Sequence, residues 1–391
     1  MASTPHDPAR AQLEALAQRG VDALRSGNGA AARPAFEAIV GSGRATLQIW
    51  LFLAQACDMI DDRPAARAAL AEVLTADPGN PYALVMQGEL YSRDGDDRAA
   101  SNWYDRAIDA GRRLQGLPAD LIARLQRADT ERRAIAARFE AAMQTALAAA
   151  GIDSSMASER FAESLAIVAG KTRPFLQEPT AFYFPGLPQR AFYDRAEFAW
   201  VAALEAAMPA IRAEAQAVLG NRAGVAPYVE RPKDRPAKSH TLLDDPRWSA
   251  FHLFRGGAPV AANAARCPAT MAAIKDLPIP VIAGRSPMVL FSILEPGTHI
   301  VPHCGMLNTR LICHLPLIVP SGCRLRVGNH ARDVEAGKLL IFDDSIEHEA
   351  WNNGDAIRVI LLFEIWRPEL TAAERAGLTA LYESVSAYDA E

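Results

Sequence analysis

Three residues in the last quarter of the chain could carry chemistry together. His303 and His348 each lie at the end of a short apolar run, and Arg358 follows in the next apolar run. Two imidazoles from different strands can hold a divalent metal and leave coordination positions open. Imidazole suits zinc, copper, iron and nickel alike, so the histidines do not choose the metal. A lone histidine at a strand end is more often structural, and the pair together favours a site.

Arg358 lies in the run AIRVILLFEIW, which is apolar at nearly every position. Apolar residues on both faces are typical of a buried strand. Burying an unpaired charge is very costly, so the guanidinium must have a partner. That partner is either an acidic residue of the chain, in a structural ion pair, or an anionic ligand gripped by the guanidinium fork.

Polar residues interrupt two further apolar runs. In RLICHLPLIV, Arg310, Ile312 and His314 would share one strand face. Ser292 places a hydroxyl within MVLFSILEP. A pocket wall that holds anions would account for these residues. Taken singly, each is better explained by a solvated strand face or a locally satisfied polar group.

The segments that must position these residues have the pattern of short strands separated by Gly, Pro and Asn turns. The candidate strands are 248–255, 288–294, 309–319, 323–328, 338–343 and 357–365. Many short strands without intervening helices predict an antiparallel sandwich or barrel such as a jelly roll. Residues 196–219 predict an amphipathic helix and 222–246 a surface loop. Thr371 and Glu374 have the spacing of a capping box, which predicts a final helix.

The first 115 residues repeat with a period of 34. Four series of residues recur in one register. The small series is Gly20, Ala54 and Gly88, and the turn series is Gly27, Asp61 and Gly95. The alanine series is Ala32, Ala66 and Ala100, and the bulky series is Phe36, Leu70 and Tyr104. Small residues allow two helices to approach, and bulky residues would fill the grooves between helix pairs. The pattern resembles three tetratricopeptide repeats near 13–46, 47–80 and 81–114, with a capping helix at 117–150. An irregular alanine-rich bundle is the alternative.

Composition sets outer limits on the protein class. The 391 residues carry a net charge of −5 and are 50% hydrophobic, which fits a globular protein of two domains and disfavours nucleic acid or an anionic membrane as the main partner. We expect a helical domain over 1–150 and a second domain over 151–391, with a hinge at 151–155. The five cysteines fit reduced thiols. With no secretory signal pattern and no long apolar run, the expected location is the cytoplasm.

The stretch from about 170 to 370 resembles the aspartyl/asparaginyl β-hydroxylase family of iron(II)- and 2-oxoglutarate-dependent dioxygenases. The resemblance is carried, in matching order and spacing, by SILEPGTHIVPHCG, RLICHLPLIVP, LLIFDDSIEHEAW and RVILLFEIWRPEL. It implies a double-stranded β-helix, which is a jelly-roll or cupin-like fold, with flanking helices.

The resemblance also implies roles for individual residues. His303 and His348 would bind Fe(II). Arg358 and Ser292 would bind the distal carboxylate of 2-oxoglutarate. His314 would stand beside this co-substrate and Trp248 would line the same pocket. Arg310 would face the substrate as a member of the catalytic set.

Two positions deserve comparison with the family pattern. Gly305 stands where most oxygenases of the wider superfamily have a carboxylate ligand; this family lacks that ligand too, and we expect water there. A nearby acidic residue would orient that water or a histidine N–H, and the candidates are Asp343, Asp344, Glu347 and Glu349. Ile312 replaces an arginine that better-known members use to recognise an acidic substrate side chain. Its presence puts strict aspartate or asparagine specificity in doubt.

The resemblance predicts hydroxylation of a carbon, such as the β-carbon of Asp or Asn, in a peptide or protein. The concave face of helical repeats suits a peptide substrate, although the repeats could instead dimerise the enzyme or dock a partner. Two alternatives remain at this stage. One is a non-catalytic scaffold with a degenerate barrel, and the other is a hydroxylase of a small molecule or lipid acyl chain.

Overall fold

The computed structural model describes residues 8–152, 158–231, 236 and 241–388. The chain divides into two compact units, 1–171 and 172–391. The division expected from the sequence, at 150/151, lies before helix α8, which belongs to the first unit. The expected hinge at 151–155 lies mostly outside the described residues.

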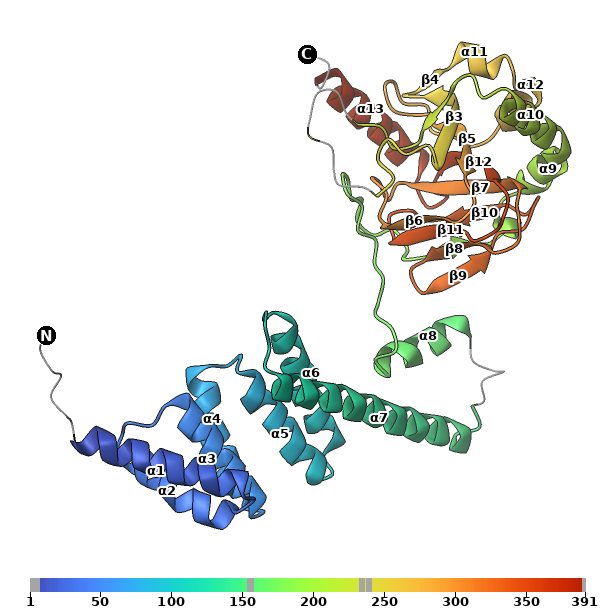
Figure 1. The fold of residues 1–391 in the computed structure, drawn as a ribbon. Coiled ribbons are helices and arrows are strands. Elements are labelled where there is room, and N and C mark those ends of the chain that lie inside the picture. The colour runs from blue at the N-terminus through green and yellow to red at the C-terminus, as the bar shows by residue number, and fades with distance from the viewer. Residues whose placement is uncertain (1–7, 153–157, 232–235, 237–240, 389–391) are drawn as a thin grey trace, which may run out of the picture. The chain divides into compact units, whose positions relative to one another are not determined.

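The first unit is built from helices arranged in antiparallel pairs (Figure 1). Their bounds are α1 (Pro8–Arg25), α2 (Gly29–Gly41), α3 (Leu47–Met59), α4 (Arg63–Ala76), α5 (Pro81–Arg93), α6 (Asp97–Arg112), α7 (Ala119–Ala149) and α8 (Glu159–Val168). The pairs α1–α2, α3–α4 and α5–α6 coincide with the three predicted repeats. Helix α7 packs against α5 and α6, as expected of the cap.

The repeated small residues allow the two helices of a pair to touch. A Cβ at Gly20 would lie 2.5 Å from the ring of Phe36, and a Cβ at Gly88 would lie 2.5 Å from the ring of Tyr104. Both contacts join helices of the same pair. Phe36 and Tyr104 therefore fill space within a pair. Phe36 also meets Phe52 of the next pair, with ring centroids 5.6 Å apart, which agrees with the expected packing between pairs.

The turn series has a conformational reason. Gly27, Asp61 and Gly95 have φ angles of 75°, 59° and 77°, in the left-handed region that closes a helix. The next residue in each repeat accepts a hydrogen bond from a backbone N–H of the second helix, which makes it the N-cap. These caps also recur with the period of the repeat and are Asn28, Asp62 and Asp96.

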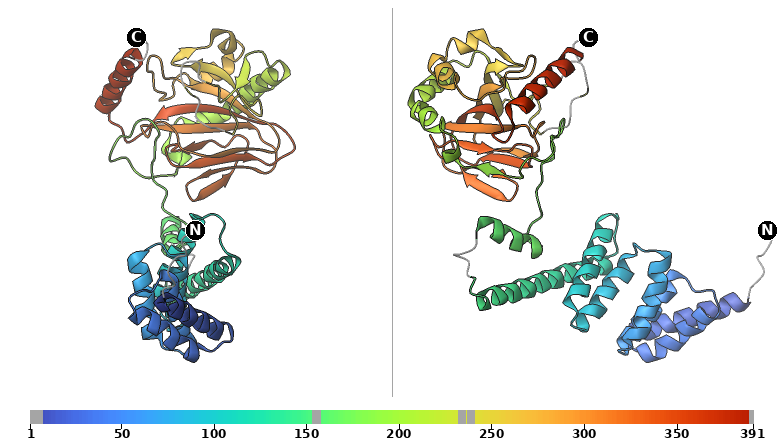
Figure 2. Two further views of the ribbon diagram at one scale, coloured as in Figure 1. Left: turned by 60° about the vertical axis from the view of Figure 1, so that its left-hand side comes forward. Right: turned by 180° about the vertical axis from the view of Figure 1, so that it is seen from behind.

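The second unit contains two sheets of antiparallel strands (Figures 1 and 2). The strands are β1 (Phe192–Tyr193), β2 (Val225–Pro227), β3 (Trp248–Arg255), β4 (Ala258–Pro259), β5 (Val289–Leu294), β6 (Thr298–His303), β7 (Arg310–Ile318), β8 (Cys323–Val327), β9 (His330–Asp333), β10 (Leu340–Phe342), β11 (His348–Asn352) and β12 (Arg358–Trp366). The larger sheet has the order β1-β10-β7-β12-β5-β3-β2, with β4 on β3. The smaller sheet has the order β6-β11-β8-β9.

Side chains from both sheets form one apolar cluster, so the sheets pack face to face as in a jelly roll. The other face of the larger sheet packs against helices. The helices of this unit are η1 (Arg195–Glu197), α9 (Val201–Ala206), α10 (Met208–Gly220), α11 (Ala261–Ala264), α12 (Pro268–Ile274) and α13 (Ala372–Tyr388). Strand β12 is buried on both faces, because Leu361 and Phe363 face the helices while Ile360 and Leu362 face the smaller sheet.

All six predicted strands are present, as β3, β5, β7, β8, β10 and β12. The final helix α13 begins with the predicted capping box, since Thr371 and Glu374 bond to each other's backbone N–H. Three departures are clear. The helix expected at 196–219 is interrupted at Ala207, the loop at 222–246 contains strand β2, and strands β6, β9 and β11 were not foreseen.

Candidate active site

A cavity of about 320 Å³ lies between the two sheets of the second unit. Its lining includes every residue that the sequence analysis proposed as a metal ligand, a co-substrate contact or a substrate contact. These are Trp248, Ser292, His303, Arg310, His314, His348 and Arg358. They come from six strands of the two sheets, so the fold brings together groups that are far apart in the chain.

The two histidines are direct neighbours across the smaller sheet. His303 ends β6 and His348 begins β11, and their Cα atoms are register partners. The ring centroids are 4.2 Å apart. His303 Nδ1 lies 2.8 Å from the carbonyl of Val301, and His348 Nδ1 lies 3.1 Å from the carbonyl of Ile346.

These carbonyl contacts assign the protons of the rings. A carbonyl only accepts, so each Nδ1 carries a hydrogen and Nε2 is the ring atom that could bind a metal. Burial, with a smaller contribution from the adjacent His303, lowers the pKa of His348 to about 3. His348 is therefore neutral at physiological pH, the state in which imidazole binds metals.

Arg358 begins strand β12 and is only 1% exposed. Burial lowers its pKa to about 10. Within the described ranges no carboxylate lies in ion-pair contact with it, and its Nε–H has no hydrogen-bond partner. The alternative of a structural ion pair is thus excluded for this part of the chain. An uncompensated buried guanidinium beside a cavity is a site for an anion.

Ser292 and Trp248 lie on the two strands beyond Arg358 in the larger sheet. Arg358 and Trp248 are both register partners of Leu294, and Ser292 is the partner of Ile360. The indole Nε1–H of Trp248 donates to Ser292 Oγ over 3.1 Å. That bond uses an acceptor position of the hydroxyl and leaves its proton available for another acceptor.

Tyr228 was not foreseen from the sequence. Its ring stacks on the indole of Trp248, with centroids 4.0 Å apart and planes at 8°. It also lines the cavity. The tyrosine lies in the segment predicted to be only a surface loop, so no signal in the sequence marked it.

His314 projects from the middle of β7, beside Leu362 in the register. Its ring meets Phe342 edge to face, with centroids 4.8 Å apart. Burial first, and then the charge of Arg358, holds the pKa of His314 well below its usual range. A neutral imidazole at this place can donate or accept one hydrogen bond without adding charge.

Arg310 differs from Arg358 because it already has acidic partners. Its guanidinium forms an ion pair with Glu364, and Nη2 lies 3.4 Å from Asp344 Oδ2. Arg310 lines the cavity as expected. Its charge, however, is matched by side chains of the chain itself.

Gly305 lies directly against the carboxylate of Asp344. A Cβ on Gly305 would be 2.1 Å from Asp344 Oδ2, so no side chain fits at position 305 while Asp344 keeps its place. Burial raises the pKa of Asp344 to about 6, with Arg310 acting in the opposite direction. The space that a ligand side chain at 305 would need is thus filled by a different carboxylate.

The other three acidic candidates point elsewhere. Glu347 and Glu349 both pair with Arg326. Asp343 is fully buried and pairs with Arg367 over 2.7 Å. Of the four acidic residues nominated from the sequence, Asp344 is the one that lines the cavity.

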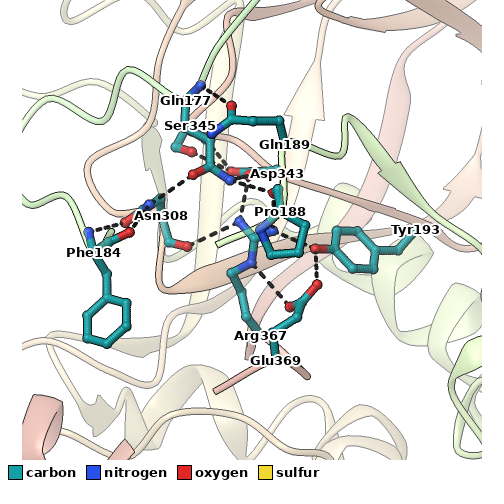
Figure 3. A network of polar contacts seen from close by, with 10 residues as sticks. All are labelled: Gln177, Phe184, Pro188, Gln189, Tyr193, Asn308, Asp343, Ser345, Arg367 and Glu369. Atoms are coloured by element: carbon teal, nitrogen blue, oxygen red, sulfur yellow. Dashed lines mark hydrogen bonds and ion pairs between the residues drawn. The ribbon is translucent and has the colours of Figure 1, made fainter. Parts of the chain in front are cut away.

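A polar network holds the turn that carries Asp343 and Asp344 (Figure 3). Asp343 accepts bonds from Arg367, from Gln177 over 2.7 Å and from the backbone and hydroxyl of Ser345. Arg367 also donates to the carbonyls of Pro188 and Asn308 and to the hydroxyl of Tyr193. This network fixes the turn between β10 and β11, and hence the approach to His348. The sequence analysis missed it.

No group of three or more His, Cys, Asp or Glu side chains that could hold a metal exists within the described residues. The residues present offer two imidazoles in one cavity, each with its Nδ1 beside a backbone carbonyl. A metal held there would need its remaining ligands from water or small molecules.

Residues 205–368 match the family model described as Aspartyl/Asparaginyl beta-hydroxylase. The ornithine lipid ester-linked acyl 2-hydroxylase of Rhizobium tropici is 38% identical over 179 residues, which is 45% of this chain and 60% of that protein. The aspartyl/asparaginyl beta-hydroxylase of Mus musculus is 37% identical over 145 residues, which is 37% of this chain and 19% of that protein. The chain therefore spans less than two thirds of the length of either relative.

Among solved structures, PcrH in complex with the chaperone binding region of PopD has a TM-score of 0.30 and 19% identity. The match covers 35% of this chain and 98% of that chain. The Sgt2 TPR domain of Aspergillus fumigatus has a TM-score of 0.27 and 17% identity, over 33% of this chain and 81% of that chain.

Proposed function

Since the second unit carries a domain of the aspartyl/asparaginyl β-hydroxylase family, we propose that this protein is an iron(II)- and 2-oxoglutarate-dependent dioxygenase. In the net reaction, a substrate C–H, dioxygen and 2-oxoglutarate give C–OH, succinate and carbon dioxide. The observation that carries the proposal is the buried Arg358, which has no carboxylate partner among the described residues, in the same cavity as two adjacent imidazoles. One feature suits an anionic co-substrate, and the other suits a metal.

His303 and His348 would hold the iron through their Nε2 atoms. The Nδ1–H bonds to backbone carbonyls orient both rings for this, as partners of metal-bound histidines commonly do. When bound, iron and 2-oxoglutarate supply the oxidising chemistry that the side chains of the chain lack. With Gly305 offering no ligand, water would complete the coordination, and Asp344 is placed to orient that water.

Arg358 and Ser292 would bind the distal carboxylate of 2-oxoglutarate. The guanidinium supplies the charge, and the Ser292 proton supplies a further donor because Trp248 fixes the hydroxyl. The low pKa of His314 keeps that ring neutral, so it can bond to the co-substrate without repelling iron. The apolar walls exclude bulk water, which strengthens each of these contacts.

The proposed substrate is a peptide or protein presented to the cavity, with the helical repeats as a candidate surface for holding it. A second candidate is an acyl group, favoured by the similarity to the Rhizobium tropici acyl hydroxylase. No helix among the described residues is long and apolar enough to cross a bilayer. A non-catalytic scaffold is the least favoured reading, because a barrel without chemistry has no use for an uncompensated buried arginine.

The direct test is turnover by the purified full chain with iron(II), ascorbate and 2-oxoglutarate, measured as succinate. We expect succinate that depends on added iron, and none from His303→Ala or His348→Ala. Iron(II) binding measured separately should be lost in both variants. Iron retained by either variant would refute the ligand role of that histidine, and the absence of succinate from the intact chain under all substrate conditions would refute the activity.

A further inference from the structure

We infer that the carbon hydroxylated in this cavity belongs to an uncharged aliphatic chain rather than to an acidic side chain. This inference rests on the proposed function and specifies its substrate. It concerns the end of the cavity away from Arg358, where Arg310, Ile312 and Asp344 form what we call the substrate wall. Glu364 does not line the cavity but forms an ion pair with Arg310.

The substrate wall is separate from the anion site. Arg358 is the first residue of β12, and Ile312 of the substrate wall is the register partner of Glu364, further along the same strand. With about 3.3 Å per residue, the two positions are about 20 Å apart along the strand. His314 is the register partner of Leu362, between them. A co-substrate bound at Arg358 therefore leaves the substrate wall for the second reactant.

The charges at the substrate wall disfavour a carboxylate. Arg310 is paired with both Glu364 and Asp344, so two carboxylates surround one guanidinium. Glu364 is 0% exposed and accepts the backbone N–H of Met288 over 3.1 Å, which fixes it in place. Among the described residues, the buried Nε–H of Arg310 has no hydrogen-bond partner. An incoming acidic side chain would add a third carboxylate without adding a cation.

The shape and polarity of the wall favour an aliphatic group. Ile312 lies between Arg310 and His314 on one strand face and is 4% exposed. Ile300, Met288 and Met306 continue the apolar lining, and Met306 is half exposed at the surface. Methionine side chains adapt to chains of varied shape. Both an aliphatic peptide side chain and a lipid acyl chain have this chemistry.

Binding to the metal-free full chain tests the inference independently of turnover. The probes are capped peptides identical except for a central norleucine or aspartate, and N-octanoylglycinamide as a neutral acyl compound. Affinities are measured by calorimetry. We expect the aspartate peptide to bind about tenfold or more weakly than the better of the two aliphatic probes, because like charges oppose it. Tighter binding of the norleucine peptide would indicate a peptide side chain as the substrate, and tighter binding of N-octanoylglycinamide would indicate an acyl chain.

Two variants sharpen the test. Glu364→Gln keeps the side-chain shape beside Arg310 and removes one carboxylate. The difference in binding affinity between the aspartate peptide and the aliphatic probes should therefore become smaller. Ile312→Arg adds a cation and should reverse the preference, whereas Ile312→Met keeps the wall apolar and should preserve it. Thermal unfolding checks that each variant is folded, and Glu364→Gln keeps the test available if Ile312→Arg does not fold.

The outcomes separate this inference from the proposed function. Tighter binding of the aspartate peptide, equal binding of all probes, or no binding of either aliphatic probe would overturn the inference, even if succinate is formed. An aliphatic preference without any iron-dependent succinate would support the substrate wall and overturn the dioxygenase activity instead.

Discussion

Arg358 and Arg367 are both buried in the second unit, with 1% and 0% of their surface exposed, yet their surroundings are opposite. Arg367 meets Asp343 over 2.7 Å and donates to several further oxygens (Figure 3). Although burial works against its charge, Asp343 raises the pKa of Arg367 above its usual value. Burial lowers the pKa of Arg358 to about 10, and no carboxylate among the described residues is in contact to oppose it.

The contrast shows how the partners of a buried charged side chain indicate whether it stabilises the fold or binds a ligand. A charge whose partners all belong to the chain stabilises the fold only if the set is complete. A buried charge without a partner raises the free energy of the ligand-free protein. Binding of an anion supplies the partner and removes this cost. The four predictions below test this difference, beginning with the largest effect.

Replacing Arg367 by Ala should destabilise the second unit by about 3–5 kcal/mol, because Asp343 would remain buried without its countercharge. The free energy of unfolding, measured in denaturant, checks this. The matched variant Arg358→Ala should leave stability unchanged or slightly higher, since it removes a charge that has no carboxylate. Equal losses of stability in the two variants would show that Arg358 stabilises the fold as much as Arg367 does.

Replacing Arg358 by Ala should raise the 2-oxoglutarate concentration needed for half-maximal turnover by about ten- to a hundredfold, equal to about 1.5–3 kcal/mol for a hydrogen bond to a charged group. Steady-state succinate formation measures it. Arg358→Lys keeps the positive charge but loses the two parallel N–H donors of the guanidinium, so the increase in the 2-oxoglutarate requirement should be smaller. An unchanged 2-oxoglutarate requirement in Arg358→Ala would show that the co-substrate binds elsewhere.

Replacing Gln177 by Ala should cost about 1–3 kcal/mol of stability, because Asp343 loses one donor and Asn308 loses its acceptor in a buried site. The effect should be smaller than that of Arg367→Ala, since the ion pair survives. Chemical denaturation of both variants gives the comparison. A larger loss from Gln177→Ala would mean that Arg367 is not the centre of this network.

The stability of the metal-free protein should fall as the pH decreases below about 6.5, partly through His348. Its pKa is about 3 in the folded state, so between pH 6.5 and 3 the unfolded chain binds the extra proton and the folded chain does not. The slope from one such group approaches about 1.4 kcal/mol per pH unit.

Asp344 acts in the opposite sense below about pH 6, because its raised pKa makes the folded state bind the proton first. The contribution of His348 is therefore obtained by measuring the free energy of unfolding against pH for the intact chain and for His348→Gln and taking the difference. The variant should lose less stability between pH 7 and pH 5. A variant with the same pH dependence as the intact chain would show that His348 titrates normally.

Much of the site could be foreseen because chemistry and strand pattern coincide at particular residues. His303, His348 and Arg358 stand out as polar groups in apolar runs, and each lines the cavity. Tyr228 could not be foreseen, because its stacking on Trp248 depends on a short edge strand inside a proline-rich segment. Strands β6 and β11 were missed as strands because polar residues interrupt both of them. The register that pairs the two histidines is a property of the sheet.

The sequence by itself determined the period of the helical repeats, the buried character of β12 and the residue types available for chemistry, since these depend on local pattern and on side-chain properties. The tertiary structure alone decided which charges are matched. Arg310, Arg358 and Arg367 are alike in the sequence, and only the packing of the sheets gives Arg310 and Arg367 acidic partners, whereas Arg358 has none among the described residues. The reason is that an ion pair depends on distance in space, which residues remote in the chain acquire only on folding.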